Sequence, residues 1–169
     1  MIKDEFNNKI GRLTKSRAYL NYCEEVYGYR AHLFNMMDKQ QIDFILQSIN
    51  LTSNDTVLDL GCGSGSLLNL LISKYGCQGI GIDQLDSSIS GNTGNKMRYI
   101  QGDIDRISEY HLKPGITLSV DSLYFSSDLD KLVRQLQGIG NNKWYFFYSQ
   151  YIVDERCEDK SILHGNHTK

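Results

Sequence analysis

Short apolar runs alternate along this chain with longer stretches in which apolar residues recur at helical spacing. The clearest run is residues 56–60, whose consecutive apolar and β-branched residues are typical of a buried strand. We also read strands at residues 79–83, 97–101, 116–120 and 144–148. Strands that alternate with helices predict an α/β fold with a Rossmann-like, doubly wound and mostly parallel sheet of about five strands.

Helices are predicted before, between and after these strands. Residues 3–29 are polar and rich in tyrosine, and we expect one or two helices packed across the mouth of the sheet. Their tyrosines either bury their rings and leave the hydroxyls in water, or form a lid over a substrate. An apolar stripe predicts a helix from Asn35, and a second stripe predicts one after residue 128. Apolar residues at 67–72 predict a helix that runs to Tyr75 and ends at Gly76, whereas residues 85–94 favour a weak, irregular helix.

A glycine-rich turn follows the first strand. Gly61, Gly63 and Gly65 permit positive φ and let a ligand approach the backbone. Asp59 places a carboxylate at the end of the strand, which suits a ligand with an ammonium group and repels a pyrophosphate. A dinucleotide-binding fingerprint that begins at Gly61 needs glycine at position 66, where this chain has Ser66.

A second carboxylate ends the next strand. Asp83 lies 22 residues after Gly61, near the spacing at which such folds place an acid on ribose hydroxyls. A carboxylate can accept two hydroxyl hydrogen bonds at once. The alternative interpretation is a solvated turn residue.

The segment Asp59–Gly65, DLGCGSG, resembles motif I of the class I S-adenosylmethionine-dependent methyltransferases. The resemblance implies S-adenosylmethionine as the cofactor, with its methionine part at the turn and its ribose on Asp83. It also implies that Asp103 takes the adenine amino group and that Ile104 lies against the ring, whereas Asp105 is expected to face solvent. The cofactor-binding residues implied in this way are Asp59, Gly61, Cys62, Gly63, Gly65, Asp83, Gln84, Asp103, Ile104 and Asp121.

The resemblance also places the end of the fourth strand nearest to the transferred methyl group. Asp121 and Tyr124 are therefore the candidate catalytic residues, Asp121 to hold a substrate amine or act as a base. Tyr124 and Phe125 either wall the pocket and face the cations, or are ordinary core aromatics. The prolines of the Asn/Asp-Pro-Pro-Tyr/Phe motif are missing here, which argues against methylation of amino groups on nucleobases.

Composition narrows the class of protein. The 169 residues suffice for one domain, and a net charge of -2 gives no footprint for nucleic acid or an anionic membrane. No apolar run approaches bilayer length and no signal peptide is evident, so we expect a cytoplasmic protein without membrane contact. The four cysteines lack a CxxC pair and are read as reduced thiols. His164 and His167 lack partners with metal-ligand spacing, so no metal site is predicted.

The resemblance covers about residues 35–152, the predicted cofactor-binding core, between a helical cap at 1–34 and a polar tail at 153–169. The family's sheet continues through another helix and two strands that this sequence lacks. We therefore expect a truncated fold whose fifth strand is an exposed edge, and an exposed edge invites a homodimer.

These features together predict a methyltransferase that moves a methyl group from S-adenosylmethionine directly to a small-molecule acceptor. One alternative is a domain that binds the cofactor without a working substrate pocket, as the short carboxyl-terminal region would suggest. The other is an NAD-dependent oxidoreductase, which Ser66 and Asp59 oppose. The pattern does not identify the acceptor atom.

Overall fold

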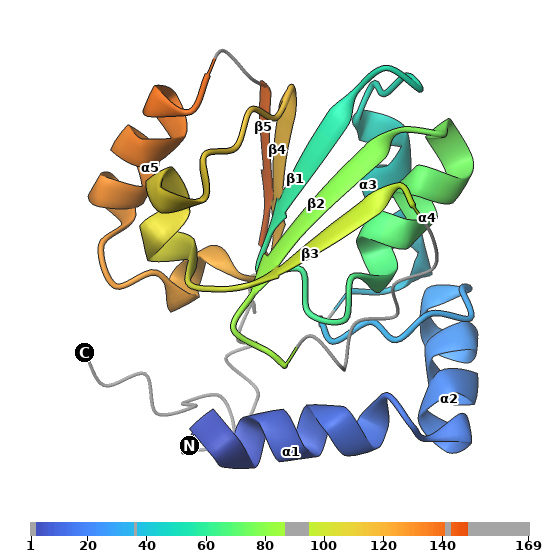
Figure 1. The fold of residues 1–169 in the computed structure, drawn as a ribbon. Helices are drawn as coiled ribbons and strands as arrows, with labels where there is room; N and C mark the ends of the chain where they lie inside the picture. The colour runs from blue at the N-terminus through green and yellow to red at the C-terminus, as the bar shows by residue number, and fades with distance from the viewer. Residues whose placement is uncertain (1–2, 36, 87–94, 141–142, 149–169) are drawn as a thin grey trace, which may run out of the picture.

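A five-stranded parallel sheet forms the centre of the molecule, in the order β3-β2-β1-β4-β5 (Figure 1). The computed structural model describes residues 3–35, 37–86, 95–140 and 143–148. The strands are β1 (Thr56–Leu60), β2 (Gln78–Asp83), β3 (Met97–Gln101), β4 (Ile116–Val120) and β5 (Lys143–Phe147). The predicted Rossmann-like α/β fold is confirmed.

Helices cover both faces of this sheet. Helices α3 (Lys39–Ser48) and α4 (Ser66–Tyr75) lie on one face, and η2 (Ile104–Tyr110) and α5 (Leu129–Gly138) lie on the other (Figure 1). Strand side chains point alternately to the two faces. Val57 accordingly packs with the α3 and α4 side, and Leu58 with the α5 side. This double burial explains why β1 has no polar alternation.

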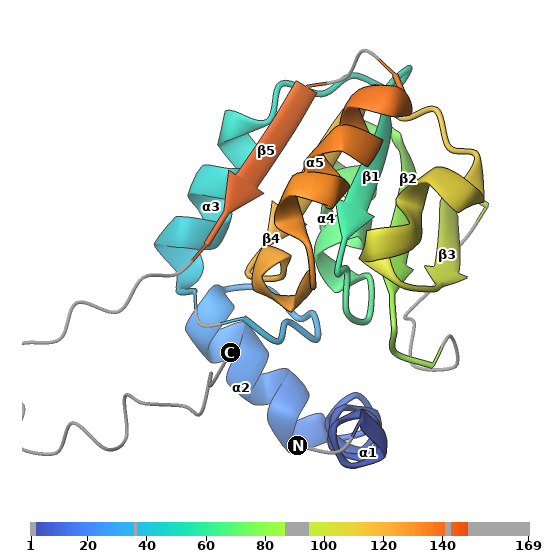
Figure 2. The same cartoon turned by 90° about the vertical axis from the view of Figure 1, so that its left-hand side faces the viewer.

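Two more helices lie beyond the carboxyl ends of the strands, as Figures 1 and 2 both show. They are α1 (Lys3–Leu13) and α2 (Arg17–Tyr27). Ser16 caps α2 by accepting a hydrogen bond from the Tyr19 backbone N–H, and Gly28 ends it with φ 71°. The expected helices at the mouth of the sheet are therefore present.

Three of the tyrosine hydroxyls of this region, those of Tyr19, Tyr27 and Tyr29, are bonded to the protein, not left in water as one interpretation had it. Tyr19 donates to the Leu33 carbonyl at 2.6 Å, and Tyr27 donates to the Asn35 carbonyl at 2.7 Å. These bonds hold the chain that follows α2 against the helix. The apolar pattern carried no sign of them because both acceptors are backbone atoms.

Helix α3 begins at Lys39, four residues later than predicted. Asp38 is its N-cap and forms a capping box with Gln41, in which each side chain accepts a hydrogen bond from the other residue's backbone N–H. The strand bounds are as predicted for β1, β3 and β4, and differ by one residue for β2 and β5. Most of the irregular helix predicted at 85–94, and the whole tail at 153–169, lie outside the described residues.

Replacing the helix-ending glycines by alanine should change the free energy of unfolding in opposite directions at Gly76 and Gly138. Gly76 closes α4 at φ 71°, a left-handed conformation that should cost alanine about 1 kcal/mol of unfolding free energy. Gly138 lies inside the last turn of α5, and a Cβ there would meet nothing within 4 Å. Gly138→Ala should therefore raise stability by about 0.5 kcal/mol. Urea denaturation measures both, and changes of the same sign would contradict the interpretation.

Candidate functional site

The two predicted carboxylates lie at the carboxyl ends of neighbouring strands. Strand β1 pairs with β2 so that Leu60 stands opposite Ile82, which brings Asp59 and Asp83 to the same edge of the sheet. Asp59 is only 3% exposed. The Asp83 carboxylate accepts hydrogen bonds from the backbone N–H groups of Gly63 at 2.7 Å and Leu85 at 2.9 Å. Asp83 therefore holds the glycine-rich turn in place.

The ionised forms of Asp59 and Asp83 are electrostatically unfavourable in the ligand-free protein. Burial, and then the charge of Asp83, raises the pKa of Asp59 to about 7. Burial also raises the pKa of Asp83, against the opposing effect of the N–H groups that it accepts. Within the described residues neither carboxylate has a Lys or Arg partner. The side-chain ion pairs there are Arg30–Glu24, Lys39–Asp43 and Arg106–Glu109.

The outer glycines of the turn are required by the protein itself. Both have positive φ, Gly61 at 71° and Gly65 at 77°, the conformation that the glycines were expected to permit. A Cβ at Gly61 would also overlap the side chain of Ser122. At Gly65 a Cβ would meet the flexible end of Met97, so the positive φ is the stronger reason there. Ligand approach, the other expected reason, is therefore not needed to explain these two.

Gly63 is the glycine with room beside it. Its φ is 57°, and a Cβ would come no closer than 3.6 Å to the nearest atom, in the Phe34 ring. Its N–H donates to Asp83, and its carbonyl accepts a hydrogen bond from the Tyr99 hydroxyl at 3.2 Å. Both backbone groups of Gly63 are thus fixed by side chains from β2 and β3.

The chain that follows α2 closes over this turn. The Ser64 hydroxyl donates to the His32 carbonyl at 2.9 Å. Phe34, beside Gly63, stacks on Tyr19 with ring centroids 5.5 Å apart. Burial lowers the pKa of His32, which favours the neutral imidazole at pH 7. An aromatic wall therefore borders the turn on the side of the N-terminal helices.

Asp103 and Ile104 lie one strand further along the same edge. Strand β3 pairs with β2 so that Gln101 stands opposite Asp83, and Asp103 follows it after one residue. One oxygen of the Asp103 carboxylate caps η2 by accepting from the Asp105 N–H at 2.9 Å. Ile104 is buried in the core on the α5 side. Their assignment to adenine stays a prediction.

Cys62 and Gln84 have different surroundings. Cys62 is buried, with its sulfur against Gly81, and burial raises the pKa of its thiol well above the ordinary value. It therefore fills space in the turn and is a poor nucleophile. Gln84 follows Asp83 and is exposed.

Asp105 does not face solvent as predicted. Its carboxylate accepts from the Ser126 hydroxyl at 2.5 Å, the Ser127 N–H at 2.7 Å and the Ser127 hydroxyl at 2.5 Å. Burial opposes ionisation, but these hydrogen bonds outweigh it and hold the pKa of Asp105 below its ordinary value. Asp105 thus anchors the loop that follows β4. The contact joins residues 21 apart, beyond the reach of a sequence pattern.

Asp121 begins this loop in a conformation that is rare for residues other than glycine. Its φ is 52°, and its N–H donates to the Phe147 carbonyl of β5 at 2.9 Å. The next residue, Ser122, is buried and shares a hydrogen bond with Ser119 at 2.6 Å. Both serine hydroxyls also contact the Leu60 carbonyl. The end of β4 is therefore fixed to the ends of both neighbouring strands.

The aromatic pair of η3 (Leu123–Phe125) is exposed. Tyr124 is 61% and Phe125 63% exposed, and their ring centroids lie 4.5 Å apart. The alternative that they are core aromatics is therefore wrong. Their predicted role beside a substrate is not tested by this geometry.

Known structures share the fold of this chain. A chain of the complex between the Haloferax volcanii Trm112 methyltransferase activator and a methyltransferase is 19% identical, with a TM-score of 0.62 over 86% of this chain and 59% of that one. An S-adenosylmethionine-dependent methyltransferase from Geobacter sulfurreducens, solved with S-adenosyl-L-homocysteine, is 17% identical, with a TM-score of 0.58 over 83% and 54%. The chain has the class I methyltransferase fold.

Other comparisons agree with this assignment of the fold. A Listeria monocytogenes structure described as an S-adenosylmethionine-dependent methyltransferase is 23% identical, with a TM-score of 0.53 over 64% of this chain and 55% of that one. The family model of the methionine biosynthesis protein MetW matches residues 39–121. No curated protein was found to match. The chain spans between half and three fifths of the length of these three structures.

Sequence reasoning missed several residues of this candidate site. The hydrogen bond from Ser64 to His32 and the one from Tyr99 to Gly63 fix the turn at two points. Ser64 lies within the motif, but neither Tyr99 nor His32 belongs to a recognisable pattern. Among the described residues, no helix is long and apolar enough to cross a membrane. The expectations for Cys157, His164 and His167 lie outside the described residues.

The raised pKa of Asp59 predicts that the stability of the folded protein depends on pH. The unfolded chain loses this proton near the ordinary pKa of 3.8, whereas the folded protein holds it up to a pKa of about 7. The folded state therefore binds more protons in that window, and its stability falls as the pH rises from about 4 to 7. Asp59→Asn should raise the stability of the ligand-free protein at pH 8 by at least about 1 kcal/mol.

The same substitution should have little effect at pH 3, where Asp59 is mostly protonated in both states. Thermal unfolding at the two pH values measures the difference, and Asp128→Asn, at the exposed N-cap of α5, is the control. An equal effect of Asp59→Asn at both pH values would contradict the ionisation argument.

Proposed function

We propose that this chain binds S-adenosylmethionine at the glycine-rich turn and transfers its methyl group to a small-molecule acceptor. The observation that carries the proposal is the pair Asp59 and Asp83. Two partly or wholly buried carboxylates lie beside an accessible glycine, with no basic partner in the described part of the chain. Such an arrangement favours a cationic ligand with hydroxyl groups.

The residues present fit the parts of this cofactor. Asp59 would attract the ammonium group of the methionine part, and the backbone at Gly63 would lie against it. Asp83 would accept from the ribose hydroxyls, with Asp103 and Ile104 at the adenine. All of them lie at or just beyond the carboxyl ends of β1, β2 and β3, where ligands of doubly wound sheets bind.

In this reaction the protein has mainly to align the acceptor atom, the methyl carbon and the sulfur. The cofactor supplies a methyl group on a sulfonium, whose sulfur leaves as a neutral thioether when the acceptor atom forms its bond to carbon. Asp121 would hold an acceptor amine or take the proton that it loses after transfer. Tyr124 and Phe125 would limit the access of water and face the cation with their rings.

Three further parts of the proposal concern organisation. We assign residues 1–34 to a cap, 35–152 to the cofactor-binding core and 153–169 to a tail. We place the protein in the cytoplasm, which suits the free thiols of Cys23, Cys62 and Cys77. A nucleic acid is not proposed as substrate because the net charge is -2.

Calorimetric titration with S-adenosylhomocysteine, and with NAD in parallel, tests the cofactor. We expect the first to bind and NAD not to bind. Asp83→Asn keeps an acceptor for the Gly63 N–H but removes a charge, and it should weaken S-adenosylhomocysteine binding by about tenfold or more. Asp128→Asn is the matched control and should bind normally.

The outcomes separate the proposal from its alternatives. Binding of NAD alone would favour an oxidoreductase. Binding of S-adenosylhomocysteine without turnover on any acceptor would favour a cofactor-binding domain that is not an enzyme. Binding of neither ligand would contradict the proposal.

We also propose that β5 pairs with a second copy of the chain. Lys143 donates from its N–H to Gly115, and Phe147 accepts from Asp121, so both turn their backbone towards β4 and its ends. In a parallel ladder the intervening residues Trp144 and Phe146 then turn theirs to the open edge. An aromatic edge strand with one charge, on Lys143, is prone to pair.

Light scattering at micromolar concentration should therefore give twice the mass of one chain. Tyr148→Lys adds a charge at the end of this edge and should shift the mass towards the monomer. Tyr22→Lys, on α2, is the control because its ring is also exposed. A monomeric mass for the unmodified chain would rule out the dimer.

A further inference from the structure

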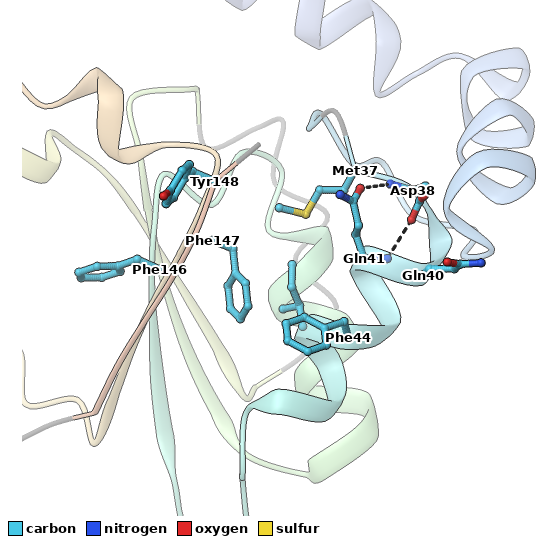
Figure 3. A pocket seen from close by; sticks show the side chains of 9 residues that line it. Met37, Asp38, Gln40, Gln41, Phe44, Phe146, Phe147 and Tyr148 are labelled. Carbon is cyan, nitrogen blue, oxygen red and sulfur yellow. Dashed lines mark hydrogen bonds between the residues drawn. The ribbon is translucent and has the colours of Figure 1, made fainter. Parts of the chain in front are cut away.

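A groove of about 580 Å³ lies between the first half of α3 and the end of β5 (Figure 3). Phe44 and Phe147 face each other across it, edge to face, with ring centroids 6.3 Å apart. The Met37 side chain points into the space between the two elements. The lining residues are Met37, Asp38, Gln40, Gln41, Phe44, Ile45, Phe146, Phe147 and Tyr148. Its volume is in the range of small-molecule sites, about 300–1,000 Å³.

The groove adjoins the proposed methyl-transfer site at Asp121. The carbonyl of Phe147, in its wall, accepts the Asp121 N–H at 2.9 Å. Strand β4 is the single strand between β1, which leads into the glycine turn, and β5. Two strand spacings, about 10 Å, therefore separate β1 from β5. An acceptor seated in the groove would lie on the β5 side of a cofactor bound at the turn.

The walls favour an aromatic or other flat apolar ligand. Phe44 is 63% and Tyr148 74% exposed, so two ring faces are available to a ligand without any displacement of the core. Rings that lie exposed together around a concave space mark binding sites more often than isolated exposed rings do. Stacking on such rings needs no new backbone conformation.

The charges of the walls favour a cation over an anion. Among the described residues of the lining, Asp38 is the only charged one. The N-terminus of α3 opposes it with a partial charge of about +0.5. Asp38 and Gln41 already satisfy two of its N–H groups through the capping box, and the full charge of Asp38 exceeds that partial charge. The aromatic faces add further attraction for a cation.

We propose that this groove binds the methyl acceptor and that the acceptor is a flat, apolar molecule carrying an amino group. The inference rests on the proposed methyltransferase function, whose site supplies the donor. It assigns Phe44 and Phe147 to ring recognition and Asp38 to charge selection. That carboxylate disfavours anionic acceptors of similar shape.

Three probes of equal shape test the chemistry: phenethylamine, phenethyl alcohol and phenylacetate. Each is titrated into ¹⁵N-labelled full-length chain, and the backbone amides of residues 38–45 and 146–148 are followed by NMR. We expect the amine to bind best, about threefold more tightly than the alcohol, which is the size of an exposed charge interaction. The carboxylate should bind most weakly.

Two variants and a control locate the site. Phe44→Ala removes an exposed ring and should weaken the amine and the alcohol at least fivefold. Asp38→Asn keeps an N-cap for α3 but removes the charge, and the preference for the amine over the alcohol should then shrink. Tyr22→Ala removes an exposed ring from α2 and should change neither affinity.

The inference fails if the probes leave the groove amides unshifted, if Phe44→Ala binds them as the unmodified chain does, or if phenylacetate binds best. S-adenosylhomocysteine is titrated into the same samples to separate this failure from that of the proposed function. Its binding without binding of the amine contradicts the groove alone. Loss of its binding contradicts the methyltransferase, whatever the amine does.

Discussion

The structure depends on two carboxylates that stand at one edge of the sheet without a cation of the described chain to balance them. Asp59 is buried at the end of β1, and Asp83 lies beside it at the end of β2. Hydrogen bonds from Gly63 and Leu85 offset part of the cost for Asp83. For Asp59, burial and the charge of Asp83 dominate and raise its pKa to about 7. Unfavourable charges of this kind concentrate at functional sites.

The rest of the fold keeps these groups where they are. Strand β1 lies between β2 and β4. The strands that follow it are added first on the β2 side and then on the β4 side, so the end of β1 is the topological switch point of the sheet. The Ser119 and Ser122 hydroxyls tie β4 to the Leu60 carbonyl. Ser122 also occupies the space that a side chain at position 61 would need. Packing against the end of β4 therefore fixes the glycine-rich turn without a bound ligand.

The sequence predicted what short segments decide locally. The apolar run of β1 and the glycine after Tyr75 suffice to give a strand and a helix end, because burial and backbone conformation act within a few residues. The start of α3 was misplaced although Asp38 and Gln41 form a capping box that sequence can show. What sequence could not show is long-range. Asp105 meets Ser126 across 21 residues, and Tyr99 meets Gly63 across 36.

The cost of the buried carboxylates also explains why this site would prefer one class of ligand. A ligand that brings a positive charge to Asp59 allows that group to ionise with a partner, so its binding free energy includes relief of an existing penalty. A pyrophosphate would add negative charge to the same edge and increase the penalty. Dinucleotide sites use a similar strand, turn and acid, so the fold alone does not decide between the two ligands. The burial of Asp59 favours the cationic ligand.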